Sequence, residues 1–246
     1  MNFTATLKGT DMTMATTEST VRELVIQSPG RAQVFERLGI DYCCGGRKPL
    51  SEACREKNLD VDTVLGALQA ADLQATDETD WTKASMTKLA DHIESTHHAY
   101  LKTELSRLSE LLPKIANVHG QNHPELADVY ATFRDLRDEL LAHMMKEEQI
   151  LFPMIRQLDQ SAGPGAFHCG SIQNPIRVMI MEHDSAGDAL ARLRRLTQDY
   201  RLPADACASY HAAYDSLAKL ELDLHQHIHK ENNILFPRAI AAEGER

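Results

Sequence analysis

Hydrophobic residues recur at helical spacing along most of the chain, and no stretch shows the apolar and polar alternation that marks a half-buried strand. Beyond residue 81 this spacing predicts four long helices, over about residues 83–112, 125–158, 175–199 and 204–241. Pro113 is expected to end the first helix, and Pro153 to bend or end the second near its last turns. Four amphipathic helices bury their apolar faces most simply as a four-helix bundle.

The first third of the chain carries shorter helical patterns, which predict a small helical domain. Thr20 and Glu23 have the spacing of a capping box, and Gly39 is placed to end a helix. Ser51 and Asp60 are expected to cap two further short helices. Polar stretches without apolar periodicity separate these parts. The expected organisation is a flexible tail over residues 1–17, a small cysteine-bearing helical domain over 18–72, a linker over 73–81 and the bundle over 82–246.

Composition limits the expected partners and compartment. The 36 acidic side chains outnumber the 26 basic ones, so the formal charge is -10 and nucleic acid is not an expected partner. No run approaches the roughly 20 apolar residues that span a bilayer, so no membrane association is expected. The cysteines are odd in number and lack the spacing of a disulfide framework, which favours a reducing compartment. We therefore expect a cytoplasmic protein.

One short segment occurs twice in the predicted bundle. Residues 143–153 read HMMKEEQILFP, and residues 227–237 read HIHKENNILFP. The similarity extends upstream, because His98 and His183 are each followed by leucines seven and ten positions later. The second pair of predicted helices therefore repeats the first pair.

Each copy of the segment places a histidine and a glutamate four residues apart, at His143 and Glu147 and again at His227 and Glu231. Residues four apart on a helix share one face. Four aliphatic residues are expected to continue this face inward, Ile150, Leu151, Ile234 and Leu235. An unpaired buried carboxylate costs several kcal/mol, and a bound metal ion removes that cost. The pattern thus favours metal binding.

With His98 and His183 from the partner helices, the set comprises four imidazoles and two carboxylates. Such a set can hold two metal ions with the carboxylates bridging, and mixed nitrogen and oxygen ligation favours iron or manganese over structural zinc. Ferritin-like bundles differ, because they use Glu-x-x-His motifs and more carboxylates. A lone buried histidine is usually a hydrogen-bonded core residue, but the duplication argues against that alternative. We predict a di-iron centre with six ligands, His98, His143, Glu147, His183, His227 and Glu231.

Other histidines lie outside this pattern. His97 adjoins His98 but lacks the leucine spacing that marks the repeat. His119 follows the predicted end of the first helix, too far along its axis to join the site, so we leave it out of the ligand set. The roles of His168 and Cys169, in a Gly/Pro-rich loop, stay open.

Cys43 and Cys44 form the other candidate site. Neighbouring Cα atoms are about 3.8 Å apart, whereas relaxed disulfides need about 4.4 to 6.8 Å, so the two cysteines cannot easily close on each other. Gly45 and Gly46 predict a tight turn, because glycine adopts backbone angles that other residues avoid. We expect two exposed, reducible thiols on this turn, able to act as a nucleophile or to handle a soft metal. Two incidental small residues are the alternative.

These motifs together resemble a known family. The turn DYCCGG and the segments HMMKEEQILFP, EHDSAGDAL and HKENNILFP are similar to the iron-sulfur cluster repair di-iron proteins, also called repair-of-iron-centres proteins. The resemblance covers about residues 19–243 and implies an all-α fold, with an up-down hemerythrin-like four-helix bundle after a small helical domain. It also implies two non-heme iron ions, joined by an oxo bridge, on the same six ligands.

The resemblance implies a function as well. Members of that family restore iron-sulfur clusters damaged by nitric oxide or oxidative stress, by delivering iron, and are bacterial stress proteins. The expected partners are iron-sulfur proteins with damaged clusters, with nitric oxide or dioxygen as small ligands, and a homodimer stays open. We expect an iron-donating protein rather than an enzyme, in which Cys43 and Cys44 relay iron or reduce the target.

Two alternatives stay open at this point. The irons could remain in place in a protein that binds or senses nitric oxide or dioxygen, or the centre could reduce nitric oxide as an enzyme. Iron transfer to an acceptor separates the repair function from both alternatives. Steady consumption of nitric oxide with a reductant favours the enzyme.

Overall fold

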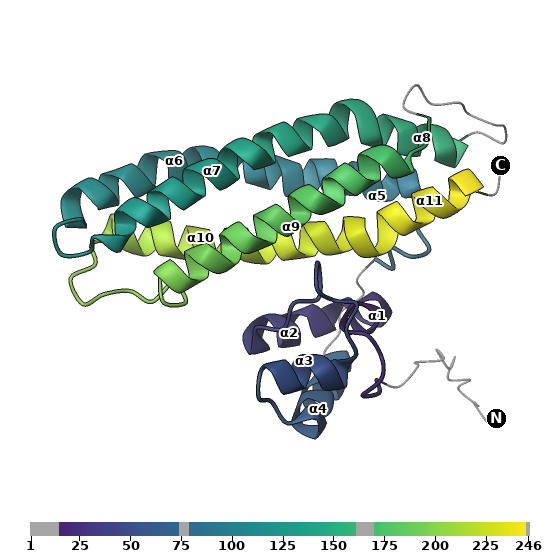
Figure 1. The fold of residues 1–246 in the computed structure, drawn as a ribbon, viewed down its shortest axis with the longest axis horizontal. Coiled ribbons are helices and arrows are strands. Elements are labelled where there is room, and N and C mark those ends of the chain that lie inside the picture. Colours follow the sequence, from purple (N-terminus) through teal and green to yellow (C-terminus); the bar gives the residue numbers. More distant parts are fainter. Residues whose placement is uncertain (1–14, 74–78, 161–169, 245–246) are drawn as a thin grey trace, which may run out of the picture. The chain divides into compact units, whose positions relative to one another are not determined.

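The computed structural model describes residues 15–73, 79–160 and 170–244, and every element named in these ranges is helical, so the all-α prediction is confirmed. The chain divides into two compact units, Met1–Glu78 and Thr79–Arg246 (Figure 1). The boundaries of the tail and the linker stay predictions. His168, Cys169 and most of the predicted tail lie outside the described residues. Within those ranges, no helix is both long enough and apolar enough to cross a membrane.

The first unit consists of short helices around an apolar core. Its elements are α1 (Val21–Gln27), the 3-10 turn η1 (Pro29–Arg31), α2 (Ala32–Leu38), α3 (Leu50–Glu56) and α4 (Val61–Asp72). Thr20 and Glu23 form the predicted capping box, and Asp60 caps α4. Gly39 ends α2 with a φ of 62°, in the left-handed region that glycine tolerates best. The expected cap at Ser51 is wrong, because α3 already begins one residue before it.

The second unit is an up-down bundle of four helical rods, so the predicted bundle is confirmed. Three rods contain a π-helical turn, in which backbone hydrogen bonds span five residues instead of four. The rods comprise α5 (Met86–His92), η2 (Ile93–His98) and α6 (Ala99–His119); α7 (Glu125–Lys146), η3 (Glu147–Leu151) and α8 (Phe152–Gln160); α9 (Gln173–Leu196); and α10 (Ala208–Lys230), η4 (Glu231–Leu235) and α11 (Phe236–Gly244). Helix α6 packs against α7 and α10, and α7 packs against α9 (Figure 1).

Pro113 does not end the first rod, so that prediction is wrong. The residue lies inside α6, and the helix continues beyond it. A proline inside a helix removes a hydrogen bond and crowds the preceding turn, but Leu112 and Ile115 are buried in the bundle core on either side of it. Their burial offsets the local cost and keeps the helix in place. Pro153 likewise lies near the start of α8, which continues beyond it.

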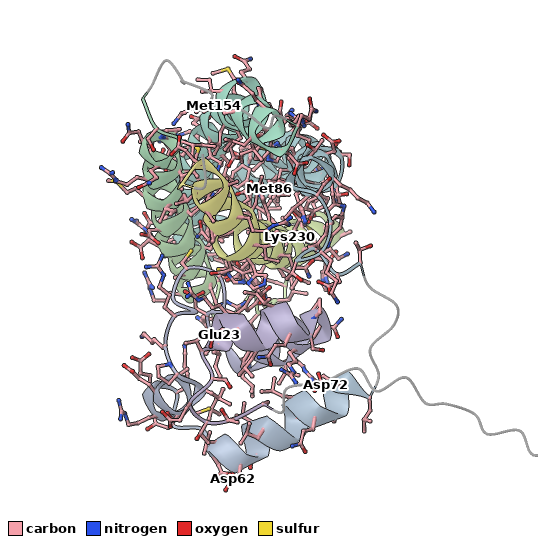
Figure 2. The ribbon with its side chains drawn as sticks, turned by 90° about the vertical axis from the view of Figure 1, so that its right-hand side faces the viewer. Glu23, Asp62, Asp72, Met86, Met154 and Lys230 are labelled. Atoms are coloured by element: carbon pink, nitrogen blue, oxygen red, sulfur yellow. The ribbon has the colours of Figure 1, made fainter. Side chains whose placement is uncertain are left out.

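An apolar core fills the bundle between α6, α7, α9 and α10. Figure 2 looks almost along the rods and shows side chains filling the space between them. Buried apolar residues continue in α5, α8 and α11. Between these two apolar regions each rod carries a buried histidine, three positions from a core residue, namely His98, His143, His183 and His227. The interior of the bundle therefore contains a polar layer.

Candidate metal centre

Three π-helical turns place the polar layer of the bundle. His98 is the last residue of η2, and Glu147 and Glu231 are the first residues of η3 and η4. A π-helical turn is wider than an α-helical one and often occurs at functional sites. Both copies of the repeated segment therefore turn a carboxylate into the bundle at the same point of the motif.

One expectation about the first copy of the segment is wrong. The sequence predicts that Ile150 faces inward, but Ile150 is 54% exposed, whereas Leu151 is 1% exposed. Leu151, at the end of the π-helical turn, takes the inward position of the first copy. Ile234 and Leu235 are both buried, as expected.

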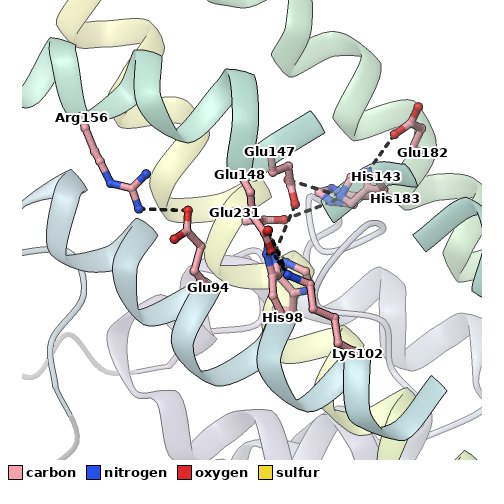
Figure 3. Close-up of polar contacts among 11 residues, drawn as sticks. Glu94, His98, Lys102, His143, Glu147, Glu148, Arg156, Glu182, His183 and Glu231 are labelled. Carbon is pink, nitrogen blue, oxygen red and sulfur yellow. Dashed lines mark hydrogen bonds and ion pairs between the residues drawn. The ribbon is translucent and has the colours of Figure 1, made fainter. Parts of the chain in front are cut away.

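The structure brings all six predicted ligands together in two clusters. Figure 3 labels each of them except His227. The His98 cluster comprises His98, Glu147, His227 and Glu231. The His143 cluster comprises His143, Glu147, His183 and Glu231. Within each cluster, one nitrogen or oxygen atom of every residue lies within 4.8 Å of the others. Both carboxylates belong to both clusters, while each cluster has two histidines of its own.

The histidines lie close to the two shared carboxylates, yet these contacts are not hydrogen bonds. Nε2 of His98 lies 3.3 Å from Oε2 of Glu147, and Nε2 of His227 lies 3.1 Å from Oε1 of Glu231. All four oxygens of the two carboxylates are buried without a hydrogen bond to any residue that the structure describes. Two ligand atoms about 2.1 Å from one ion, at right angles, lie about 3 Å apart, which matches this spacing. The residues therefore fit a pair of bound cations.

Charge also favours cations here. Burial raises the pKa of Glu147 and Glu231, but the facing imidazoles outweigh it, so the pKa of each carboxyl group lies below its usual range. Burial lowers the pKa of His143, but the Glu147 carboxylate raises it more strongly, to about 9. The carboxylates are thus ionised in an interior where uncompensated charge is costly. Divalent ions that displace protons from the imidazoles would compensate them.

Three of the four histidines donate a hydrogen bond from Nδ1. The acceptors are Glu148 for His98, at 2.8 Å, Glu182 for His143, at 2.8 Å, and Asn232 for His183, at 2.9 Å. Such a bond fixes the proton on Nδ1 and leaves Nε2 to face the cluster. These three roles are absent from the sequence-based prediction, although position gives a signal, because Glu148 and Asn232 directly follow the two shared glutamates.

The phenylalanine of each repeated Ile-Leu-Phe-Pro run packs on a ligand histidine. Phe152 stacks on His98 with ring centroids 5.7 Å apart, and Phe236 stacks on His183 with centroids 6.0 Å apart. Both phenylalanine rings are buried, so they restrict the orientation of the imidazoles. Each Ile-Leu-Phe-Pro segment lies within a helical rod, and its phenylalanine packs against a histidine of the clusters.

A cavity lies between α7, α9 and α10, beside the clusters. Its lining includes three of the ligand histidines, His143, His183 and His227, together with Glu182 and Ile228. The cavity has a volume of about 10 Å³, room for about one water-sized molecule, and is lined by side chains of both clusters.

The neighbouring histidines have other partners. His119 packs edge-on against Tyr210, with ring centroids 5.3 Å apart, and joins neither cluster. His97 precedes His98 and is also buried, but its Nδ1 lies 2.9 Å from Oδ1 of Asp223.

Cys43 and Cys44 lie in the first unit, between α2 and α3. Cys44 is partly exposed but Cys43 is buried, so the expectation of two exposed thiols is wrong for Cys43. The hydrogen bond with Cys44, together with burial, raises the pKa of the Cys43 thiol well above its usual value. The sulfur atoms are 3.8 Å apart and form no disulfide. Cys44 is therefore the more accessible thiol of the pair.

The glycines beside the cysteines are needed for space rather than for backbone angle. Neither Gly45 nor Gly46 has a positive φ, contrary to the prediction. A side chain at Gly46 would collide with the carbonyl oxygen of Tyr42. The Asp41 carboxylate accepts hydrogen bonds from the backbone N–H groups of Cys43, at 2.9 Å, and Gly45, at 2.8 Å. These bonds hold the turn in a compact form.

The fold and the two clusters define a helical bundle with two His/Glu metal sites that share their carboxylates. Residues 89–239 match the family described as the hemerythrin HHE cation binding domain, and residues 17–72 match a domain described as of unknown function.

Relatives that match nearly the whole chain are named after one activity. The "Probable iron-sulfur cluster repair protein" of Haemophilus influenzae is 38% identical over 92% of this chain and 99% of its own length. The "Iron-sulfur cluster repair protein YtfE" of an Enterobacter species and that of Escherichia coli are each 38% identical over 94% of this chain and 100% of their own length. The chain belongs to the iron-sulfur cluster repair protein family.

Proposed function

We propose that this protein repairs iron-sulfur clusters damaged by nitric oxide or oxidative stress, and that it does so by donating iron from its two metal sites. The names of its relatives support the repair activity. Four imidazoles and two carboxylates suit non-heme iron, so the proposed ions are two irons with the six clustered residues as ligands. An oxo bridge between the irons stays a prediction.

Glu147 and Glu231 belong to both clusters, which supports donation of iron. Each ion then has only two histidines of its own, so neither site is closed by a full set of private ligands. After an iron has left, protons on the imidazoles can compensate the carboxylates. The raised pKa of His143 supports this exchange of iron for protons. A centre built in this way can lose iron without leaving buried charge unpaired.

Iron transfer is the test of the proposal. Protein loaded with ⁵⁷Fe is mixed under reducing conditions with a [4Fe–4S] enzyme that nitric oxide has damaged. We expect the enzyme to regain activity and its rebuilt clusters to contain ⁵⁷Fe. Glu231→Gln should fail, because it removes a shared ligand, while His211→Glu, at an exposed position of α10, should work normally. Recovery that carries no ⁵⁷Fe would contradict donation.

We also assign the transfer step to the cysteine pair of the first unit. Cys44 is the more accessible thiol and Cys43 is its hydrogen-bonding neighbour, which supports a relay of iron or reduction of the target. The double variant Cys43→Ser with Cys44→Ser should keep its iron content but lose repair, and Cys207→Ser is the matched control. Unchanged repair by the double variant would refute the relay.

Damaged iron-sulfur proteins are the proposed partners, and the cytoplasm is the proposed location. None of the four cysteines that the structure describes forms a disulfide, which supports a reducing compartment.

The cavity supports a second candidate function, the binding or reduction of nitric oxide or dioxygen. It is lined by His143, His183 and His227, so a small ligand in it would contact residues of both clusters. In this case the irons stay bound while the ligand binds or is consumed. Retention of all ⁵⁷Fe during repair assays, with steady loss of nitric oxide in the presence of a reductant, would favour this function over iron donation.

A further inference from the structure

The four ligand histidines differ in what their outer ring nitrogen contacts. His98, His143 and His183 each donate from Nδ1 to a side-chain acceptor. Nδ1 of His227 is buried and has no hydrogen-bond partner among the residues that the structure describes. The His98 cluster therefore contains one histidine without an orienting partner, whereas both histidines of the His143 cluster have one.

This difference between the clusters arises at one position of the internal repeat. The acceptor Glu182 directly precedes His183 in the sequence, whereas His97 directly precedes His98. Glu182 thus places a carboxylate beside His143 of the neighbouring rod, whereas His97 places an imidazole beside His227. The His97 ring lies nearly parallel to the His227 ring, with centroids 5.5 Å apart and planes 6° apart. In this arrangement His97 presents no lone pair to the ring N–H of His227.

His97 is itself held by two polar neighbours. Its Nδ1 lies 2.9 Å from Oδ1 of Asp223, and its Nε2 lies 2.8 Å from Nζ of Lys230. Because a lysine ammonium group only donates, Nε2 of His97 accepts from Lys230 and its Nδ1 donates to Asp223. Both ring nitrogens of His97 are thus engaged, and neither serves His227.

An unpaired outer nitrogen weakens a histidine ligand. When Nε2 of His227 binds a cation, the ring proton must sit on Nδ1, where it is buried without an acceptor. Loss of the partner of a ligand histidine typically lowers metal affinity by about 10–100-fold. The cavity reaches both clusters, because its lining includes His227 as well as His143 and His183.

We propose that the His98 cluster holds its iron more weakly than the His143 cluster, and that it supplies the iron that this protein donates. The inference rests on the proposed function, since it names which of the two ions is the cargo. His97 then sets the difference between the clusters, because it lies where a carboxylate would otherwise support His227.

The order of release can be tested site by site. Protein loaded with two irons is titrated with a ferrous chelator under reducing conditions until half of the iron has left. It is then crystallised, and anomalous scattering of iron locates the ions that remain. We expect density between His143 and His183 and little between His98 and His227. Stronger density at the His98 cluster, or equal density at both clusters, would overturn the inference.

A variant can give His227 of the His98 cluster a carboxylate neighbour like the one that His143 has in Glu182. His97→Glu should slow removal of the first iron by about 10–100-fold and leave removal of the second unchanged. Because the new carboxylate would face Asp223, the double variant with Asp223→Asn removes the repulsion and is used if the single variant does not fold. His211→Glu is the control for the change of charge. A folded variant that loses its first iron as fast as wild-type protein would refute the role of His97.

These outcomes separate the inference from the proposed function. If the His98 cluster loses iron first but damaged enzyme is not restored, the order of release stands and the proposed function fails. If damaged enzyme is restored with ⁵⁷Fe while both irons leave at equal rates, the proposed function stands and the difference between the clusters is wrong.

Discussion

The two halves of the bundle carry the same clustered histidines and glutamates. The residues that contact the outer ring nitrogens of those histidines differ between the halves. In each half a histidine precedes a His-x-x-x-Glu pair, a π-helical turn begins at the glutamate, and a phenylalanine stacks on the upstream histidine. The supports differ at two positions of the repeat. Glu148 corresponds to Asn232, and Glu182 corresponds to His97.

The residues that face the clusters are therefore distinct from those that contact the outer ring nitrogens. The side chains that face the clusters occur twice, whereas the residues that contact the outer ring nitrogens do not. A charged acceptor strengthens an imidazole ligand more than a neutral one, and a missing acceptor weakens it. Two sites with the same ligand types can therefore differ in strength.

The largest effect is expected from a residue that both clusters share. Glu231→Gln removes a carboxylate from both sites and should abolish nearly all metal binding, whereas His183→Ala should remove about one of the two ions. Metal content per chain after identical purification measures this. Glu110→Gln, at an exposed position of α6, should leave the metal content unchanged. Equal losses in the Glu231 and His183 variants would erase the distinction between shared and private ligands.

The metal-free protein should show a pH dependence that comes from the first half. Folding raises the pKa of His143 from 6.5 to about 9, so protonation stabilises the fold fully below pH 6.5, and this contribution is lost as the pH rises through 9. The difference is on the order of 3 kcal/mol. Urea unfolding at about pH 6 and pH 9.5 should show it in metal-free wild-type protein. The same loss of stability in His143→Gln would assign the effect to another group.

The supports can be exchanged between the halves. Asn232→Asp gives His183 a charged acceptor, and Glu148→Gln gives His98 a neutral one. Charge-assisted hydrogen bonds are about twice as strong as neutral ones. The first change should therefore slow iron loss and the second should speed it, each by about tenfold or less. Stopped-flow transfer to a ferrous chelator measures both rates, and shifts in the same direction would show that acceptor charge does not set the strength of the site.

The smallest effect is expected from the two lysines that pair with the carboxylate acceptors Glu148 and Glu182. Lys102 pairs with Glu148 and Lys146 pairs with Glu182, each at a partly exposed position. Ion pairs that water screens contribute about 1 kcal/mol or less. Lys102→Met and Lys146→Met should therefore change the free energy of unfolding and the rate of iron loss only slightly. A large effect of either change on iron loss would mean that the ion pair, and not the carboxylate alone, tunes the histidine.

The six clustered residues could be predicted because the duplication marks them. A single His-x-x-x-Glu pair is weak evidence for a metal site, but two pairs, at His143 and His227, each with an upstream histidine at a matching offset, single out one set of residues. The structure brings that set together. The four rods were predictable as well, because apolar periodicity is a direct consequence of burying one helical face.

The other features of the site and fold depend on three-dimensional geometry, which the spacing of residues in the sequence does not show. Ile150 faces solvent although the equivalent Ile234 is buried, a difference that the repeated spacing does not show. Pro113 is a local stop signal that tertiary packing overrides. Glu182 supports His143 only because α9 lies beside α7, and sequence spacing within one helix cannot show a contact between two.

In the proposed centre, six side chains from four rods hold two iron ions between them. Anomalous diffraction at the iron absorption edge, from crystals of fully loaded protein, locates these ions. We predict two iron peaks, one among the ligand atoms of each cluster, with the carboxylates of Glu147 and Glu231 next to both. A single peak, or peaks away from these six side chains, would contradict the account.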